Sequence, residues 1–219
     1  MGGSSNALLF QSAHMMSSRS ELKVTVFSDY ICPFCYVGDA RLDRLREDYD
    51  LKVNWCFLEI HPETSPEGEP VASLDYPSET WQRMMATLGE MAKEENLPLL
   101  DHDFTTNSRS ALLLAEAAKY IDRDVFYRLH KRLFEAFFAE GKNIGDRNCL
   151  SRLALDAGLS KEQAETAWQD PSVVTRLQQY RKAAADLGVQ ATPTYFFGEQ
   201  RLDGAVPVEQ LVQAARTIG

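Results

Sequence analysis

The sequence lacks the segments that would place a protein in a membrane or on a nucleic acid. Its longest apolar runs are far too short to span a bilayer, and no run of basic residues occurs along its 219 residues. Acidic residues outnumber basic ones by 32 to 23, which gives a formal net charge of −9. Because nucleic acids and anionic membranes carry the same sign of charge, we expect neither as a main partner.

The N-terminal segment lacks the positively charged start and the apolar stretch of a secretory signal peptide. Residues 1–20 are rich in serine and glycine, and His14-Met15 followed by Met16 is typical of a cloning junction ahead of a native start. The sequence therefore predicts a disordered, cloning-derived extension over residues 1–20. It also predicts a cytoplasmic protein, whose thiols are kept reduced.

Cysteine and histidine are scarce, and their spacing speaks against a metal centre. The four cysteines include one C-x-x-C pair, Cys32 and Cys35, and no second pair. The histidines are scattered along the chain at His14, His61, His102 and His130. A zinc site would need Cys56 and Cys149 to complete it from afar, so we expect no metal site and two free, buried cysteines at these positions.

The most informative stretch is Cys32-Pro33-Phe34-Cys35, which stands between a strand-like and a helix-like run. Two thiols separated by two residues can close a small disulfide ring and open it again. At the start of a helix, the positive end of the backbone dipole favours thiolate over thiol at the outer cysteine. From the spacing alone, half of a zinc site, a static disulfide or two inert packed cysteines remain alternatives.

The residues around the motif predict a strand, a helix and a second strand. Apolar residues alternate over residues 22–27 and again over 51–57, as in strands. Pro33 suits the first helical position, because its missing N–H needs no partner there. We expect Cys32 to lie exposed at the mouth of this helix with a lowered pKa, and Cys35 to lie a turn deeper with a higher pKa.

A second informative stretch lies near the C-terminus, where Thr192-Pro193 precedes a predicted β-hairpin. Residues 195–197 and 200–203 predict two short strands, joined by a tight turn at Gly198-Glu199. A trans proline that ends a loop fits these residues. A cis proline that leaves the Thr192 backbone free to pair with a bound peptide fits them too.

Between residues 58 and 187 nearly every signal is helical. Residues 58–77 predict a proline-rich loop, and amphipathic helices follow it. Ser160 and Gln163 have capping-box spacing, and Gly158 predicts the end of the helix before them. A separate helical domain in tandem would not explain why strand signals resume only after this region.

Cys-Pro-aromatic-Cys-Tyr-Val-Gly after an early strand, with Gly-Val-x-x-Thr-Pro-Thr before a late hairpin, resembles the DsbA-like thioredoxin-fold superfamily. The pattern is most similar to its FrnE-like branch, which shares this fold with 2-hydroxychromene-2-carboxylate isomerases and kappa-class glutathione transferases. The resemblance covers about residues 22–218. It implies an α/β fold in which residues 21–60 and 188–219 form a thioredoxin-like sheet and residues 61–187 form a large all-helical insertion.

The resemblance also implies roles for three residues. Cys32 would be the nucleophile, Cys35 the resolving cysteine, and Pro193 the cis-proline facing them. The isomerase and transferase relatives carry serine at the position of Cys32 and use glutathione, so the dithiol of this chain favours disulfide exchange. Phe34 stands where the branch usually has tryptophan, which alters surface contacts without removing the chemistry.

We therefore expect an enzyme, a thiol–disulfide oxidoreductase or isomerase that exchanges disulfides with protein or small thiol substrates. Pro33, Phe34 and Thr192 are predicted to contact the substrate. Asp29 and Glu59 are interpreted as solvated loop carboxylates, with a role in moving the thiol proton as the alternative. No cofactor is required, and glutathione or thioredoxin would supply electrons. The alternative functions are a glutathione-dependent isomerase or transferase of the 2-hydroxychromene-2-carboxylate isomerase type, and a non-catalytic, chaperone-like binding module.

Overall fold

The computed structural model describes residues 19–101 and 103–218. Residues 1–18 of the predicted N-terminal extension, with His14 and His102, lie outside the described residues. The helices and strands follow in the order β1 (Glu21–Ser28), α1 (Pro33–Asp43), β2 (Asp50–Phe57), β3 (Glu69–Pro70), α2 (Ser78–Glu94), β4 (Phe104–Thr105), α3 (Arg109–Ile121), α4 (Arg123–Phe138), α5 (Arg147–Ala157), α6 (Lys161–Ala167), α7 (Pro171–Asp186), β5 (Thr194–Phe197), β6 (Gln200–Asp203) and α8 (Val208–Arg216).

Four strands form one mixed sheet in the order β2-β1-β5-β6. β1 and β2 are parallel, which requires the crossover that α1 provides, and β5 pairs antiparallel with both β1 and β6. Val26 lies at the centre of the sheet, beside Trp55 of β2 on one side and Tyr195 of β5 on the other. The two ends of the chain that carry the informative motifs are therefore neighbours in the sheet.

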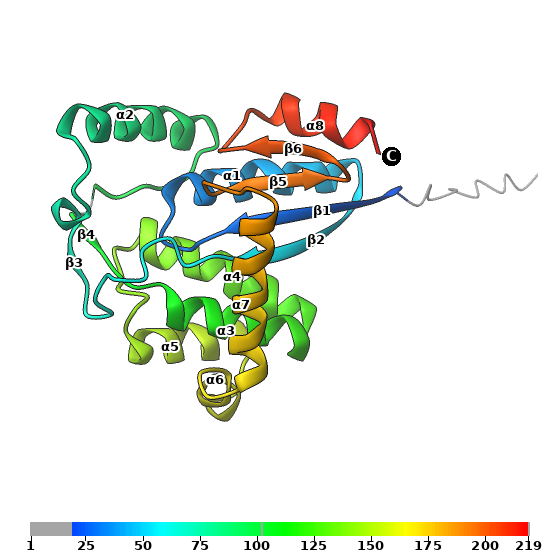
Figure 1. Ribbon diagram of the computed structural model, residues 1–219. Helices are drawn as coiled ribbons and strands as arrows, with labels where there is room; N and C mark the ends of the chain where they lie inside the picture. The colour runs from blue at the N-terminus through cyan, green and yellow to red at the C-terminus, as the bar shows by residue number, and fades with distance from the viewer. Residues whose placement is uncertain (1–18, 102, 219) are drawn as a thin grey trace, which may run out of the picture.

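The helices cover both faces and the lower side of this sheet (Figure 1). In that view α1 lies behind the strands, α7 rises in front of β1 and β2, α3 to α6 gather below, and α2 and α8 lie above. One large buried cluster runs from Val24 and Trp55 in the sheet to Leu129 and Leu150 in the helices. The sheet and the helices thus share one core. The division of the chain at residues 60 and 188 into two domains stays a prediction.

The helix starts and ends that the sequence predicted for α1, α5 and α6 are present in the structure. Pro33 is the first residue of α1, and the capping box between Ser160 and Gln163 opens α6. Gly158 ends α5 at φ 105°, a left-handed conformation that glycine adopts without a Cβ clash. Such signals depend on neighbours within a few residues, which is why the sequence reveals them.

The region predicted as a proline-rich loop contains more structure than expected. Val71–Leu74 forms a 3-10 helix, and β3 pairs antiparallel with β4 from beyond α2. The insertion over residues 61–187 therefore holds one short strand pair beside its helices. Two-residue strands are too short for an alternating pattern to reveal them. Within residues 19–101 and 103–218, no helix combines the length and the apolar character needed to cross a bilayer.

Candidate active site

Cys32 caps the N-terminus of α1, and the loop before β5 lies against it. The Cys32 backbone is extended, at φ −85° and ψ 112°, and its carbonyl accepts the N–H of Cys35 at 3.0 Å. The Cys32 thiol donates a hydrogen bond to the carbonyl of Thr192 at 3.3 Å. The Thr192–Pro193 peptide bond is cis, the isomer that the family resemblance implied. The fold thus joins two motifs that lie 160 residues apart.

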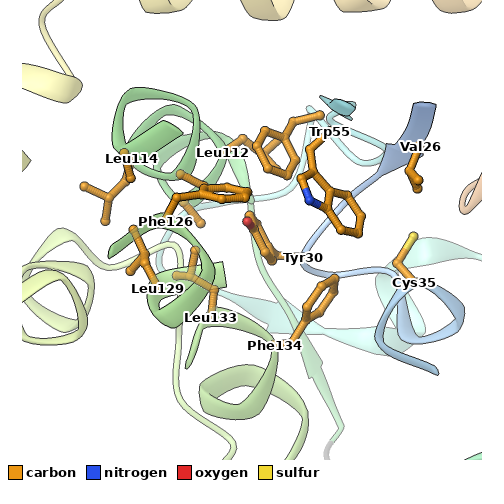
Figure 2. Close-up of a cluster of buried hydrophobic side chains, with 14 of the residues drawn as sticks. Val26, Tyr30, Cys35, Trp55, Leu112, Leu114, Phe126, Leu129, Leu133 and Phe134 are labelled. Carbon is orange, nitrogen blue, oxygen red and sulfur yellow. The ribbon is translucent and has the colours of Figure 1, made fainter. Parts of the chain in front are cut away.

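Cys32 is less accessible than expected. The sequence predicted an exposed thiol, but the residue is only 5% exposed. The prediction was wrong because the segment that covers it, around Thr192, comes from the other end of the chain. Cys35 is deeper still, at 1% exposed, as predicted. Figure 2 shows its sulfur pointing toward Val26 in the sheet.

The two thiols have opposite acid strength. Hydrogen bonds from the Cys35 thiol, the Thr192 side chain and the Cys35 N–H lower the pKa of Cys32 against the opposing effect of burial. Burial, followed by the hydrogen bond to Cys32 and the charge on its sulfur, raises the pKa of Cys35 well above its ordinary value. These are the predicted directions. The structure adds that hydrogen bonds supply the stabilisation at Cys32 for which the helix dipole alone was invoked.

Asp29 is the buried carboxyl beneath this pair. The prediction that Asp29 is a solvated loop carboxylate was wrong, because the residue is 0% exposed. Its side chain accepts the N–H of Ile31 at 3.3 Å, the N–H of Ile60 at 2.8 Å and the hydroxyl of Ser108 at 3.0 Å. Burial outweighs these hydrogen bonds and raises the pKa of Asp29 to about 7. The Asp29 carbonyl also accepts the N–H of Cys32 at 3.2 Å, so one residue fixes the exits of β1 and β2 and the start of α3.

Glu59, the second predicted loop carboxylate, is paired. It accepts the side-chain amide of Asn107 at 2.9 Å and the guanidinium of Arg109 at 3.3 Å. Its side chain is 17% exposed, so its position is set by these partners as well as by solvent. Glu59 contributes a coulombic influence that raises the pKa of Asp29.

The three residues predicted to contact the substrate lie next to Cys32 in the sequence or in the fold. Pro33, Phe34 and Thr192 are half-buried. Phe34 packs against the small cluster that contains Val37 of α1 and Leu88 of α2. Three further apolar residues of α2 are half-buried: Trp81, Met84 and Met85. The structure therefore places an apolar, methionine-bearing helix beside the residue that precedes Cys35.

A buried histidine connects the two sides of the motif, and sequence reasoning missed it. The ring of His130 in α4 makes two hydrogen bonds. Its Nδ1 lies 2.7 Å from the hydroxyl of Tyr30, and its Nε2 lies 3.1 Å from a carboxylate oxygen of Asp39. A carboxylate only accepts, so Nε2 donates to Asp39 and Nδ1 accepts the hydroxyl of Tyr30. Tyr30 precedes Cys32 by two residues, and Asp39 lies one turn beyond Cys35. No spacing in the sequence marks this contact, because α4 lies about a hundred residues away.

The other two cysteines lie in the core, as predicted. Cys56 is packed under α7 and Cys149 within the helices, at 4% and 6% exposed, and each of the four cysteines is free. Burial raises the pKa of Cys56 to about 11, so it is a poor nucleophile at neutral pH. Among the described residues, no group of three or more His, Cys, Asp or Glu side chains is placed to hold a metal ion.

Comparison with known proteins identifies the family. The DSBA-like thioredoxin domain matches residues 23–216. The chain belongs to this family. The uncharacterized protein YwbO of Bacillus subtilis (strain 168) is 31% identical over 191 residues, which are 83% of this chain and 90% of YwbO. The ClpXP adapter protein SpxH of the same bacterium is 24% identical over 191 residues, 87% of this chain and 63% of SpxH.

Solved structures share the fold of this DSBA-like chain. The probable DsbA oxidoreductase SCO1869 from Streptomyces coelicolor is 25% identical, with a TM-score of 0.79 over 90% of each chain. A 2-hydroxychromene-2-carboxylate isomerase has a TM-score of 0.71 at 19% identity, over 90% of this chain and 96% of its own. The cytosolic disulfide reductase DsbM from Pseudomonas aeruginosa, solved with glutathione, has a TM-score of 0.64 at 21% identity, over 83% and 90%. The predicted α/β, thioredoxin-like fold is confirmed, and the narrower assignment to the FrnE-like branch stays a prediction.

Proposed function

We propose that this DSBA-like chain is a thiol–disulfide oxidoreductase that works through Cys32 and Cys35. The observation that carries the proposal is the placement of the two thiols at the start of α1: Cys32 caps the helix against the carbonyl before the cis Thr192–Pro193 bond, and Cys35 lies deeper in the helix. The pKa, lowered at Cys32 and raised at Cys35, agrees with this placement. A lowered pKa increases the fraction of Cys32 present as the attacking thiolate, and a raised pKa keeps the Cys35 sulfur protonated until the first step is complete.

The exchange proceeds in two steps that need no metal or organic cofactor. The Cys32 thiolate attacks a substrate disulfide, forms a mixed disulfide, and releases one substrate sulfur with its electron pair. Cys35 then loses its proton and attacks Cys32, which closes the internal disulfide and releases the second substrate sulfur. The Thr192 backbone would align an extended substrate peptide, and Pro33 and Phe34 would contact it. In the reverse direction the same groups oxidise a substrate dithiol.

We also propose the partners and the compartment on the strength of the relatives. DsbM is a cytosolic disulfide reductase solved with glutathione, which supports glutathione as an electron donor and a cytoplasmic location for this chain. Thioredoxin is the alternative donor. Protein disulfides are the proposed substrates, because Phe34 lies two residues beyond Cys32 and packs with Met85 on the same small cluster, and such half-buried apolar side chains suit peptides of varied sequence.

The test is reduction of insulin disulfides and of a small aromatic disulfide, in the presence of glutathione. Cys32→Ser should abolish both activities, whereas Cys35→Ser should accumulate a mixed disulfide that mass spectrometry detects. Cys56→Ser is the matched control, because it removes a buried thiol that is remote from α1, and it should keep full activity. If Cys32→Ser and Cys35→Ser both retained wild-type rates, the proposal would be wrong.

A binding role without thiol chemistry is the second candidate, and the likeness to the adapter protein SpxH favours it. Suppression of aggregation that survives replacement of both Cys32 and Cys35 would support it over the oxidoreductase. A glutathione-dependent isomerase predicts turnover of a small aromatic substrate that survives loss of Cys35. The two cysteine variants therefore separate all three functions.

A further inference from the structure

The hydroxyl of Tyr195 is buried without a hydrogen-bond partner among the described residues. Tyr195 is the second residue of β5 and is only 1% exposed. Buried polar side chains are nearly always hydrogen-bonded, so an exception calls for an explanation. At a site of chemistry, one explanation is a group whose partner is the charge that develops during the reaction.

The hydroxyl lies on the side of the sheet that faces the resolving cysteine. Tyr195 is the direct antiparallel neighbour of Val26, so the two side chains share one face of the sheet. Figure 2 shows the sulfur of Cys35 pointing toward this same Val26. The side chains of Tyr195 and Cys35 therefore lie on the same side of the sheet, the side that α1 covers.

Gly38 leaves the space that admits the hydroxyl. It follows Cys35 by three residues, so it occupies the same face of α1 one turn further on. A methyl group at Gly38 would overlap the Tyr195 hydroxyl, and it would also press on the ring of Pro193 at 3.0 Å. The hydroxyl thus lies directly against the backbone of the helix that carries both cysteines.

The electrostatic surroundings of Tyr195 agree with this position. Burial raises its pKa well above 10, and the charges of Cys35, Asp39 and Cys32 raise it further, with Cys35 first among them, while the charge of Arg41 opposes them. The hydroxyl therefore keeps its proton at any physiological pH. It can donate a hydrogen bond to a sulfur anion, but it does not act as a base.

We propose that the Tyr195 hydroxyl donates a hydrogen bond to the Cys35 sulfur and stabilises its thiolate during the resolving step. This inference rests on the oxidoreductase function proposed above. In that step Cys35 gives its proton to solvent, and its sulfur attacks Cys32. The Cys32–Cys35 bond forms while the Cys32–substrate bond breaks, and the substrate sulfur leaves with the electron pair of that bond and is then protonated. Tyr195 gains and loses no proton.

Tyr195→Phe removes only the hydroxyl, and an aromatic disulfide with a coloured leaving thiol reports both steps. The attack by Cys32 releases the first coloured thiol, and resolution by Cys35 releases the second. Loss of one hydrogen bond to the thiolate should displace the pH profile of the second release by about one unit to higher pH. At neutral pH the tenfold smaller thiolate fraction is offset about threefold by the greater nucleophilicity of a more basic thiolate, which leaves a net slowing of about threefold.

Two controls make the outcome decisive. Tyr36→Phe removes a hydroxyl that donates to the carbonyl of Pro98, away from the sheet. This variant should have the same pH profile of the second thiol release as the wild type. Cys35→Ser should show no second release, which excludes the buried Cys56 and Cys149 as its source. A profile of Tyr195→Phe that coincides with the wild type would overturn the inference. A uniform slowing without displacement would also overturn it, because that would indicate a structural role. Failure of the wild type itself to give a second release would refute the oxidoreductase function instead.

Discussion

Replacing Asp29 by asparagine should remove a pH-dependent penalty on folding. Burial raises the pKa of Asp29 from 3.8 to about 7 in the folded protein. A carboxyl with a higher pKa in the folded than in the unfolded state binds more protons when folded. Its contribution to the free energy of unfolding is therefore complete below about pH 4 and is lost progressively as the pH rises to about 7.

The size of this effect follows from the displacement of the pKa. A shift of about three units, at about 1.4 kcal/mol each, makes the wild type lose about 4 kcal/mol between these pH values. Asparagine does not titrate, but its amide nitrogen cannot accept the backbone N–H that one carboxyl oxygen accepts, which costs about 1 kcal/mol at every pH. The variant should therefore be about 1 kcal/mol less stable than the wild type at pH 4 and about 3 kcal/mol more stable at pH 8.

Urea unfolding of the reduced protein at a series of pH values measures this difference. The wild-type and Asp29→Asn curves should cross between pH 4 and pH 7. Ser108→Ala is the informative companion, because loss of its hydrogen bond raises the pKa of Asp29 further and extends the slope to higher pH. The Asp29 charge also raises the pKa of Cys32, so the variant should form the Cys32 thiolate at lower pH. Parallel stability curves for the two proteins would refute the reasoning.

Three further predictions concern packing around α1, and urea unfolding or proteolysis tests them. Gly38→Ala should cost about 1–3 kcal/mol of stability through overlap with the Tyr195 hydroxyl, and most of this cost should vanish in a Tyr195→Phe background. Equal costs in the two backgrounds would contradict the contact. His130→Ala should cost about 3 kcal/mol, because it opens a cavity among aromatic rings and leaves a tyrosine hydroxyl unpaired; a loss below about 1 kcal/mol would be inconsistent with this packing. Arg41→Met removes the closer of the two arginine partners of Glu95, at the end of α2, and should expose α2 to limited proteolysis. Unchanged resistance would mean that other contacts anchor this helix.

Much of the fold could be predicted because its signals are local. The alternation in β1 and β2, the proline that starts α1 and the capping box of α6 each depend on residues within one or two turns. The hairpin of β5 and β6 was predicted from the strand residues and the turn between them. The pairing of β3 with β4 could not be predicted, since two residues at each end of a long connection carry no periodic signal.

The features of the site also fall into those that local sequence predicts and those that depend on distant residues. The identity of the two thiols and their order in acid strength follow from Cys32-Pro33-Phe34-Cys35 and a helix N-terminus. How far their pKa values separate also depends on residues that reach the site from elsewhere in the chain: Thr192 lies against Cys32, and Ser108 binds Asp29, whose charge acts on Cys32. The sequence marks Thr192 through the proline that follows it, whereas Ser108 is an ordinary residue type at a position that no spacing marks. Two family members with identical C-x-x-C segments should therefore differ in thiol chemistry wherever these distant residues differ, and the swap of a single such residue should transfer the difference.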